Sequence, residues 1–356
     1  APIVHETAAV LGGVTIVMAG LIAIVQTDIK RVVAYSTMSQ IGYMFVGVGL
    51  GAYGAGMFHL MTHAFFKALL FMSAGIVIHA LSGEQDIRKM GGLGRELPLT
   101  YKLFTIGALA LAAIPPFSGF FSKDSILSSA IDAGALGIAL WVLGVVGALL
   151  TGLYTFRLVF IVFLGRQEPF VKQHLHRERF EGPLAMVWPC LILAVLAAFA
   201  GWLQVPGGWA AVDTWLDPVA ESIPEATGGL LAFSVLASVA AAVTGVAIAW
   251  RLYGRRSEAP ARLRARFPQV AALLEHKFYF DELYDRIFYE PASRLAVLLE
   301  RKVERPLVLS PPEEVGSGTR GLGRRIAAAQ SGLLRLYALL IAGGLVVLVV
   351  VFLAVQ

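Results

Sequence analysis

Charged residues are scarce in this chain, and long apolar runs take their place. Only 15% of its 356 residues are charged, whereas 57% are hydrophobic, with apolar runs such as 139–150 and 339–355. Soluble domains average about 25% charged residues, so this chain lacks the polar surface that would cover its apolar side chains. The composition excludes an ordinary soluble protein and indicates an integral membrane protein.

The near absence of cysteine excludes several kinds of site. Cys190 is the only thiol, so no intrachain disulfide, CxxC redox pair or cysteine-held cluster is possible. The net charge of +5 comes from basic residues scattered over several loops, a distribution that does not favour nucleic-acid binding. No cleavable signal peptide is evident and the first residue is not Met, so we expect the numbering to begin inside a longer polypeptide.

The apolar runs, extended by their flanks to about 20 residues, have the length that a hydrocarbon layer requires. They predict an all-α fold, a polytopic transmembrane helical bundle of about eight spans, since a membrane barrel would need short alternating strands. The expected spans lie near residues 8–27, 31–51, 54–81, 99–129, 134–165, 184–204, 228–251 and 331–355.

Basic residues occupy every second connection between these spans. They occur at 30–31, 88–102, 166–179 and 251–335. The other connections differ: 51–54 has no charge, Asp132 stands alone, and every charged residue of 205–227 is acidic. The positive-inside rule therefore places the basic loops in the cytoplasm and both ends of this chain on the outer side.

Two segments differ from simple spans. The helix near 99–129 contains Pro115–Pro116 followed by Gly119, which predicts one broken helix made of two half-helices. Such a break survives in a membrane only where it faces protein or a water-filled cavity. The stretch 258–328 is charged and interrupted by prolines, so it does not span. Its apolar residues recur at helical spacing and predict a long lateral amphipathic helix on the cytoplasmic surface before the last span.

The strongest candidate site lies on the third span, where His59, His63 and Lys67 recur at intervals of four. This spacing places them along one stripe of a helix, and Lys67 lies about 20 Å into its span, near the middle of the membrane. A charged amine at that depth costs roughly 2.5–3.5 kcal/mol, so burial favours its neutral form and makes proton exchange possible. With two imidazoles that titrate near neutral pH, it forms a candidate proton relay.

Other interpretations of this stripe stay open. Lys67 could instead pair with an acidic residue on a neighbouring helix, with both histidines as satisfied core residues. A metal site at His59 and His63 is disfavoured, because no HExxH glutamate and no third ligand is evident. The GxGxxG pattern at 49–54 joins two apolar helices, so it indicates a helical hairpin and not a cofactor-binding site.

Lys123 and Asp124 follow the Pro115–Gly119 break and form a second candidate relay site. Backbone groups that the break frees would solvate the amine, and Asp124 points about 100° away from it around the helix. The alternative is that Asp124 caps the half-helix. Asp28 and Lys30 border two spans and belong either to an interfacial turn or to a charged axis.

Seven segments carry a family resemblance: Gln26–Gly42, His59–Ala68, Gly83–Gly92, Gly119–Asp124, Leu153–Val162, Phe280–Asp285 and Gln330–Leu339. They resemble the antiporter-like subunit L of respiratory complex I, the NADH–quinone oxidoreductase, whose mitochondrial form is chain 5. Such subunits carry two inverted repeats, each with a broken helix and a buried lysine, and the resemblance covers the second. It implies a second antiporter-like repeat at 1–165 with its break near 115–119, additional transmembrane helices at 166–257, a lateral element at 258–328 and a C-terminal transmembrane anchor at 329–356.

The resemblance implies that this chain translocates protons, driven by electron transfer from NADH to quinone in other subunits. Lys67 resembles the central lysine of the family's second half-channel, with His59 and His63 as its relay neighbours. Lys123 resembles the lysine of the broken helix that passes protons to the outer side. No cofactor is then expected in this chain, and FMN, iron–sulfur clusters and quinone are expected in partner subunits.

The implied surroundings are a bacterial inner membrane, its lipid bilayer and the other membrane-arm subunits of complex I. Neighbouring antiporter-like subunits are expected along 258–328. Two alternatives stay open. The large subunit of a multi-subunit Na⁺/H⁺ antiporter has similar spans, although the long charged element before the last span favours complex I. The other alternative is a structural subunit whose buried charges only hold helices together.

Overall fold

The fold is all-α, as the sequence predicts. The computed structural model describes residues 2–176, 180–205, 208–220, 223–254, 258–330 and 332–355. Within these ranges the regular structure is helical, and β pairing is limited to the isolated bridges Asp28–Asp86 and Gln204–Ala210. The chain divides into two units, Ala1–Phe278 and Tyr279–Gln356, and each is described by itself.

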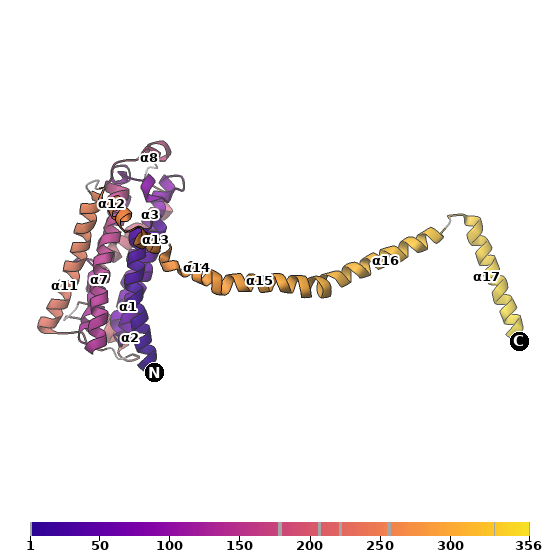
Figure 1. The fold of residues 1–356 in the computed structure, drawn as a ribbon, viewed down its shortest axis with the longest axis horizontal. Coiled ribbons are helices and arrows are strands. Elements are labelled where there is room, and N and C mark those ends of the chain that lie inside the picture. The colour runs from indigo at the N-terminus through magenta and orange to yellow at the C-terminus, as the bar shows by residue number, and fades with distance from the viewer. Residues whose placement is uncertain are drawn as a thin grey trace. The chain divides into compact units, whose positions relative to one another are not determined.

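The first unit is a bundle of long helices with short helices at its ends (Figure 1). The long helices are α1 (Pro2–Val25), α2 (Ile29–Leu50), α3 (Tyr53–Ala80), α7 (Gly134–Leu158), α9 (Leu184–Phe199) and α11 (Gly228–Ala249). Two helices of intermediate length are α5 (Pro98–Leu111) and α6 (Ser118–Ile131). The short ones are α4 (Leu93–Glu96), α8 (Pro169–His174), α10 (Ala211–Leu216), α12 (Ala259–Arg266) and α13 (Pro268–Glu275).

Six helices in the described ranges are long and apolar enough to cross a membrane. The sequence predicts about eight spans, and the other two are α2 and the pair α5–α6. α2 has 22 residues but carries polar side chains into the bundle, and each half of the pair has only 14 residues. The six are Pro2–Val25, Tyr53–Ala80, Gly134–Leu164, Leu184–Leu203, Gly228–Gly254 and Leu334–Val355.

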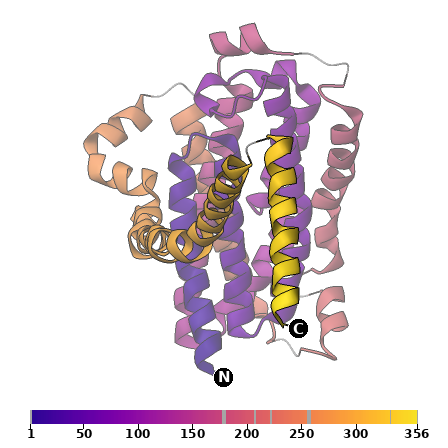
Figure 2. The same cartoon turned by 90° about the vertical axis from the view of Figure 1, so that its right-hand side faces the viewer.

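Small residues allow the closest helix contacts in the first unit. α1 lies along α2 and α7, and α7 lies along α11 (Figure 1). Figure 2 shows long helices of this unit running side by side. A Cβ on Gly12 of α1 would lie 2.6 Å from the Gly42 oxygen of α2, and one on Gly42 would lie 2.7 Å from the Gly12 oxygen. Such close approach is typical of membrane helices, because packing holds them together in lipid.

The loops of the bundle gather at two ends that differ in charge. At one end the basic connections meet, since Ile29 N–H donates to the Gln85 oxygen (3.0 Å) and His176 N–H donates to the Ala80 oxygen (2.9 Å). At the other end Ile223 N–H donates to the Gly51 oxygen (3.1 Å), which joins the acidic connection 205–227 to the α2–α3 turn. Residues 177–179, 206–207, 221–222 and 255–257 of these loops lie outside the described residues.

The predicted broken helix is confirmed. α5 ends at Leu111 and α6 begins at Ser118, so the break covers 112–117 and starts slightly before the predicted position at 115–119. The start of α5 is capped from another loop, because the Glu181 carboxylate accepts hydrogen bonds from the N–H groups of Leu99 and Thr100 (2.7 and 2.8 Å). This cap satisfies donors that the first helical turn leaves without partners.

Gly119 allows the two half-helices to approach, because a Cβ there would overlap the Ala110 carbonyl oxygen. We expect Gly119→Ala to push α6 away from α5 and to lower the free energy of unfolding by about 1–3 kcal/mol, the usual cost of overpacking. Gly229→Ala is the matched control, since nothing lies within 4 Å of a Cβ at that position. Thermal unfolding of both variants in detergent is the measurement, and equal Tm values would contradict the close contact.

The second unit contains one long helical run followed by α17 (Leu334–Val355) (Figure 1). α14 (Phe280–Tyr284), α15 (Glu290–Leu299) and α16 (Ser310–Ala329) are joined by π-helical segments at Asp285–Tyr289 and Glu300–Leu309. The predicted long helix before the last span is therefore confirmed for 280–329. The predicted element began at 258, but residues 258–279 form the short helices α12 and α13 and a turn in which Lys277, Phe278 and Tyr279 have positive φ. The expectation that Pro291 and Pro306 interrupt the 280–329 run is wrong. Pro291 lies in the first turn of α15, and Pro306 lies in the π-helical segment Glu300–Leu309, whose wider turns accommodate a residue that cannot donate a backbone hydrogen bond.

Candidate functional site

The α3 stripe that the sequence predicts lies inside the bundle. His59, His63 and Lys67 are only 0%, 7% and 5% exposed, so all three side chains are withdrawn from lipid and bulk water. They share one face of α3 because their spacing of four nearly matches the helical repeat. That face packs against α2 and α6, the two helices that supply its hydrogen-bond partners.

The Lys67 amine is held by neutral groups of α2. Its Nζ donates to the Val33 carbonyl oxygen (3.0 Å) and to the Ser36 hydroxyl. Among the residues that the structure describes, Lys67 makes no ion pair, so the acidic partner of the structural alternative is not found there. An amine with neutral partners remains able to give up its proton, whereas an amine locked to a carboxylate does not.

His59 joins three helices through both ring nitrogens. Its Nε2 lies 3.2 Å from Gln40 Oε1 on α2, and its Nδ1 lies 2.9 Å from the Ser122 hydroxyl on α6. The Gln40 amide and the Ser122 hydroxyl thus lie within hydrogen-bond distance of the two ring nitrogens, one on each. His59 therefore connects the α3 stripe to the broken helix.

His63 lies between His59 and Lys67 along the stripe. Its ring centroid is 6.2 Å from that of His59 and 5.3 Å from that of Phe66. Its Nε2 is buried and has no hydrogen-bond partner among the described residues. Such a nitrogen is a place where a proton or a water molecule binds. No three His, Cys, Asp or Glu side chains gather as metal ligands in the described ranges.

A row of polar side chains that the sequence analysis missed joins Lys67 to His59. The Tyr154 hydroxyl of α7 donates to the Thr151 hydroxyl (3.3 Å) and lies near the side chains of Ser36 and Gln40 on α2. Ser36 also holds Lys67, and Gln40 also holds His59. The sequence does contain a sign of this row, since Ser36 and Gln40 recur at a spacing of four within a span.

Removal of the Tyr154 hydroxyl tests whether this row carries protons. Tyr154→Phe keeps the ring of a side chain that is 1% exposed, so we expect normal assembly. Proton transport through the chain should slow roughly 10-fold or more, since a positioned proton-transfer group contributes about 10²–10⁴-fold. Proton uptake by vesicles that hold the intact complex is the measurement, with Tyr101→Phe as the control. Equal transport in the two variants would show that the Tyr154 hydroxyl takes no part in proton transfer.

Lys123 lies beside the break, where the end of α5 holds its amine. The side chain is fully buried, and Nζ donates to the carbonyl oxygen of Leu111, the last residue of α5 (3.2 Å). The amine also lies 4.9 Å from the centroid of the Tyr43 ring, a cation–π contact. The break thus supplies the backbone oxygen that the sequence leads us to expect near this lysine.

The side chains of Asp124 and Lys123 bind to different helices, α11 and α5. Its Oδ1 accepts a hydrogen bond from the Ser238 hydroxyl of α11 (2.5 Å), and the residue is 1% exposed. The N-cap of α6 is Phe117, which makes no side-chain capping bond. The alternative that Asp124 caps the half-helix is therefore wrong, and Asp124 is an interior acid of α6.

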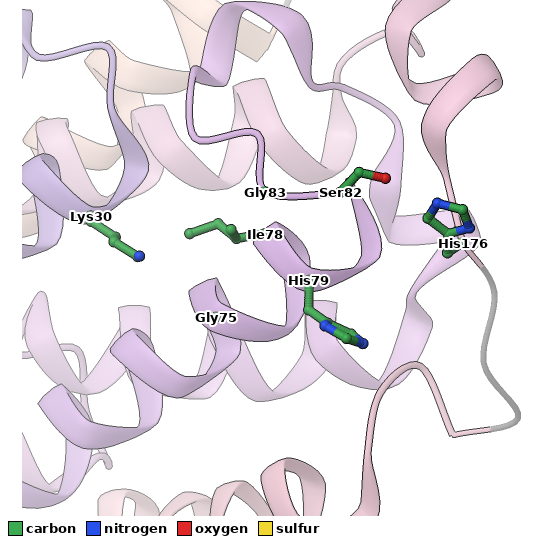
Figure 3. A pocket seen from close by; sticks show the side chains of 7 residues that line it. All are labelled: Lys30, Gly75, Ile78, His79, Ser82, Gly83 and His176. Carbon is green, nitrogen blue, oxygen red and sulfur yellow. The ribbon is translucent and has the colours of Figure 1, made fainter.

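Asp28 and Lys30 lie at the end of the bundle where the basic loops meet. Asp28 is the N-cap of α2, and its carboxylate accepts from Arg31 N–H (3.0 Å). Lys30 is exposed and lines a surface pocket of about 620 Å³ together with His79 and His176. Figure 3 shows Lys30 and His176 on opposite sides of the last turns of α3. In the described part of the chain, neither Asp28 nor Lys30 contacts the α3 stripe.

Arg157 is a buried charge that the sequence analysis missed. It lies near the end of α7, is 7% exposed, and donates from Nη1 to the Gln26 carbonyl oxygen (2.8 Å). Its guanidinium carbon lies 5.6 Å from the centroid of the Tyr253 ring. Arg157 therefore ties the α1–α2 turn to the ends of α7 and α11. A lone arginine within an apolar run was the sign that could have revealed it.

Known proteins resemble this chain in sequence over most of its length. Residues 1–151, which hold the α3 stripe and the broken helix, match the family described as NADH:quinone oxidoreductase/Mrp antiporter, TM. NADH-quinone oxidoreductase subunit L of Escherichia coli (strain K12) is 40% identical over 353 residues, which are 94% of this chain and 52% of that protein. Residues 1–151 thus match this antiporter-like family, and most of the chain is similar to subunit L. The resemblance seen in the sequence is therefore confirmed.

Further relatives extend the match over nearly the whole chain. Subunit L of Pseudomonas aeruginosa (strain ATCC 15692) is 42% identical over 359 residues, 98% of this chain and 54% of that protein. The solved archaeal membrane-bound sulfane sulfur reductase, a respiratory membrane complex, has a chain with a TM-score of 0.61 and 25% identity, covering 90% of this chain and 56% of that one. The chain spans about half the length of the curated relatives it matches. Family and helices together identify a multi-pass membrane protein.

Proposed function

We propose that this chain translocates protons as a non-redox, antiporter-like subunit of an NADH–quinone oxidoreductase. The observation that carries the proposal is the buried polar row that runs from Lys67 past His59 to the broken helix with Lys123. Within the described residues, neither lysine is neutralised by an ion pair. The relatives are named as subunits of NADH-quinone oxidoreductase, which supports electron transfer as the driving reaction.

In the proposed mechanism, protons move by exchange between neighbouring groups of the row. Lys67 receives a proton from the cytoplasmic side and passes it to His59 along His63 and the hydroxyl groups of Ser36 and Tyr154, and Ser122 connects His59 to the broken helix. Lys123 takes the proton there and Asp124 passes it toward the outer side. We place Asp28 and Lys30 at the cytoplasmic edge of the chain and assign them no transfer step.

The proposal assigns the redox chemistry to partner subunits, where FMN, iron–sulfur clusters and quinone would bind. A single cysteine does not supply the thiolates that an iron–sulfur cluster requires. Neighbouring antiporter-like subunits would lie along the 258–328 element, whose residues Leu295, Leu298 and Leu299 are exposed in the second unit. The membrane would be the bacterial inner membrane, with the basic loops and the lateral element in the cytoplasm and both ends of this chain outside.

Proton transport by inside-out membrane vesicles that contain the intact complex tests this proposal. We expect transport to follow NADH oxidation, to stop when quinone reduction is inhibited, and to proceed in sodium-free medium. Transport that needs sodium and no redox substrate would instead support the alternative, the large subunit of a multi-subunit Na⁺/H⁺ antiporter. The matching family description names both kinds of system, so this measurement separates them.

A further inference from the structure

At the end of the bundle that carries the acidic loops, one segment is hydrogen-bonded to the broken helix. Residues 223–227 lead from α10 into α11. Ala226 N–H donates to the Ser128 oxygen of α6 (3.2 Å), and Ile223 N–H donates to the Gly51 oxygen of the α2–α3 turn (3.1 Å). These two bonds, on either side of Glu225, hold its backbone against the second half of the broken helix.

Two buried polar atoms of α6 lie near this segment without hydrogen-bond partners. Asp124 and Ser125 are 1% and 0% exposed, yet Asp124 Oδ2 and Ser125 Oγ have no partner among the described residues. Buried polar atoms are nearly always satisfied in native proteins, so an adjacent unsatisfied pair needs a reason. Exchange of a proton or of water at this place supplies one.

Glu225 interacts with both of these residues. Its carboxyl group interacts with the Ser125 side chain, and its charge acts on Asp124. Glu225 also interacts with Asp213 of α10, whose Oδ2 accepts from Gln204 Nε2 (2.9 Å). The charge of Glu225 is therefore coupled both to the interior acid of α6 and to an acid of α10.

The surroundings of Glu225 suit a group that takes up and releases protons. Burial, and next the charge of Asp213, raise the pKa of the Glu225 carboxyl group, and burial likewise raises the pKa of Asp213. A glutamate in this state holds its proton nearer to neutral pH than an exposed one. Carboxyl groups tuned in this way are typical of proton-transfer sites.

We propose that Glu225 is the terminal proton acceptor of this chain, receiving the proton from Asp124 past Ser125. The Asp124 carboxyl group loses its proton and becomes a carboxylate, the Glu225 carboxylate gains it, and Glu225 then releases it to water at the acidic end of the bundle. Only O–H bonds break and form. The inference rests on the proposed function and adds an outlet to it. Glu225 lies far from the lysine stripe in sequence, in a loop that shows no motif.

The alternative is that Glu225 only fastens its loop to α6. Glu225→Gln separates the two roles, because the amide keeps the size and polar contacts of the side chain but does not carry the proton. Glu225→Asp keeps a titratable carboxyl group. In proteoliposomes that hold the intact complex, we expect Glu225→Gln to slow proton release through this chain roughly 10-fold or more, and Glu225→Asp to restore most of it. The readout is protons released per NADH oxidised, followed with a pH-sensitive dye.

Asp217→Asn is the matched control, since Asp217 is an exposed acid in the same loop region, and it should pump as the unmodified complex does. An unchanged proton-to-NADH ratio in Glu225→Gln would contradict the role of Glu225 as the terminal proton acceptor. Lys67→Met, measured in parallel, then distinguishes the two proposals. If Lys67→Met loses pumping, only the role of Glu225 is contradicted and the proposed function is supported. If Lys67→Met pumps normally, the proposed function is contradicted as well. Should Glu225→Gln assemble poorly, Ser125→Ala removes the intervening hydroxyl instead, and an unchanged ratio there also overturns the outlet.

Discussion

Lys67→Arg should strongly slow proton translocation while the complex still assembles. Arginine keeps the positive charge beside Ser36 and the Val33 oxygen, but it does not lose its proton in a protein. A relay needs a group that alternates between two protonation states, so a permanent cation interrupts it. We expect proton transport through this chain to fall roughly 10-fold or more. The measurement is NADH-driven proton uptake by membrane vesicles, normalised to the amount of assembled complex.

Two further variants define what this result means. Lys67→Met removes the charge and should lose transport as well, because the relay needs the amine itself. Lys30→Arg is the matched control, since Lys30 is exposed and has no transfer step. Normal pumping in Lys67→Arg would show that the amine need not lose its proton. Failure of Lys67→Arg and Lys67→Met to assemble, with a normal proton ratio in the remaining complex, would favour a purely structural subunit.

Lys123→Met is expected to interrupt the row at the broken helix. The Lys123 amine is fully buried and bound to the Leu111 oxygen, so it is the group placed to take a proton at the break. Transport should again fall roughly 10-fold or more. Unlike loss of Lys67, loss of Lys123 leaves the α3 stripe intact, so a proton should still reach His59 and stop there. Proton uptake in a single turnover should therefore persist while proton release on the opposite side is lost.

Tyr43→Phe is the matched control for Lys123. The phenylalanine ring keeps a π face under the amine, whereas the hydrogen bond from the Tyr43 hydroxyl to the Gly144 oxygen (2.5 Å) is lost. Loss of one such bond costs about 1 kcal/mol of stability, so we expect a slightly less stable complex with near-normal transport. Normal proton release in Lys123→Met would contradict the role of the broken helix.

The features that could be predicted from the sequence are those with a local signature. A spacing of four marks the α3 stripe, and Pro115–Pro116 with Gly119 marks the broken helix. Long apolar runs mark most spans, because hydropathy needs no knowledge of neighbours. The expectation that prolines interrupt the lateral element is wrong for a local reason too. A π-helical segment lets the helix continue past Pro306.

The partners of the buried groups could not be predicted, because they come from distant parts of the chain. Lys67 and Ser36 are separated by 31 positions, His59 and Ser122 by 63, and Asp124 and Ser238 by 114. Helix packing decides which of many polar residues meet, and one sequence does not fix that packing. Asp124 illustrates the consequence, since a capping role fitted its position in the sequence but not its contact with α11.

The relay depends above all on the Lys67 amine changing its protonation state during turnover. Isotope-edited infrared difference spectroscopy of the intact complex, with labelled lysine and Lys67→Met as the spectral reference, reports that state directly. We predict an ammonium band of Lys67 that disappears and returns as NADH is oxidised. An ammonium band that persists unchanged through every stage of turnover would contradict the relay.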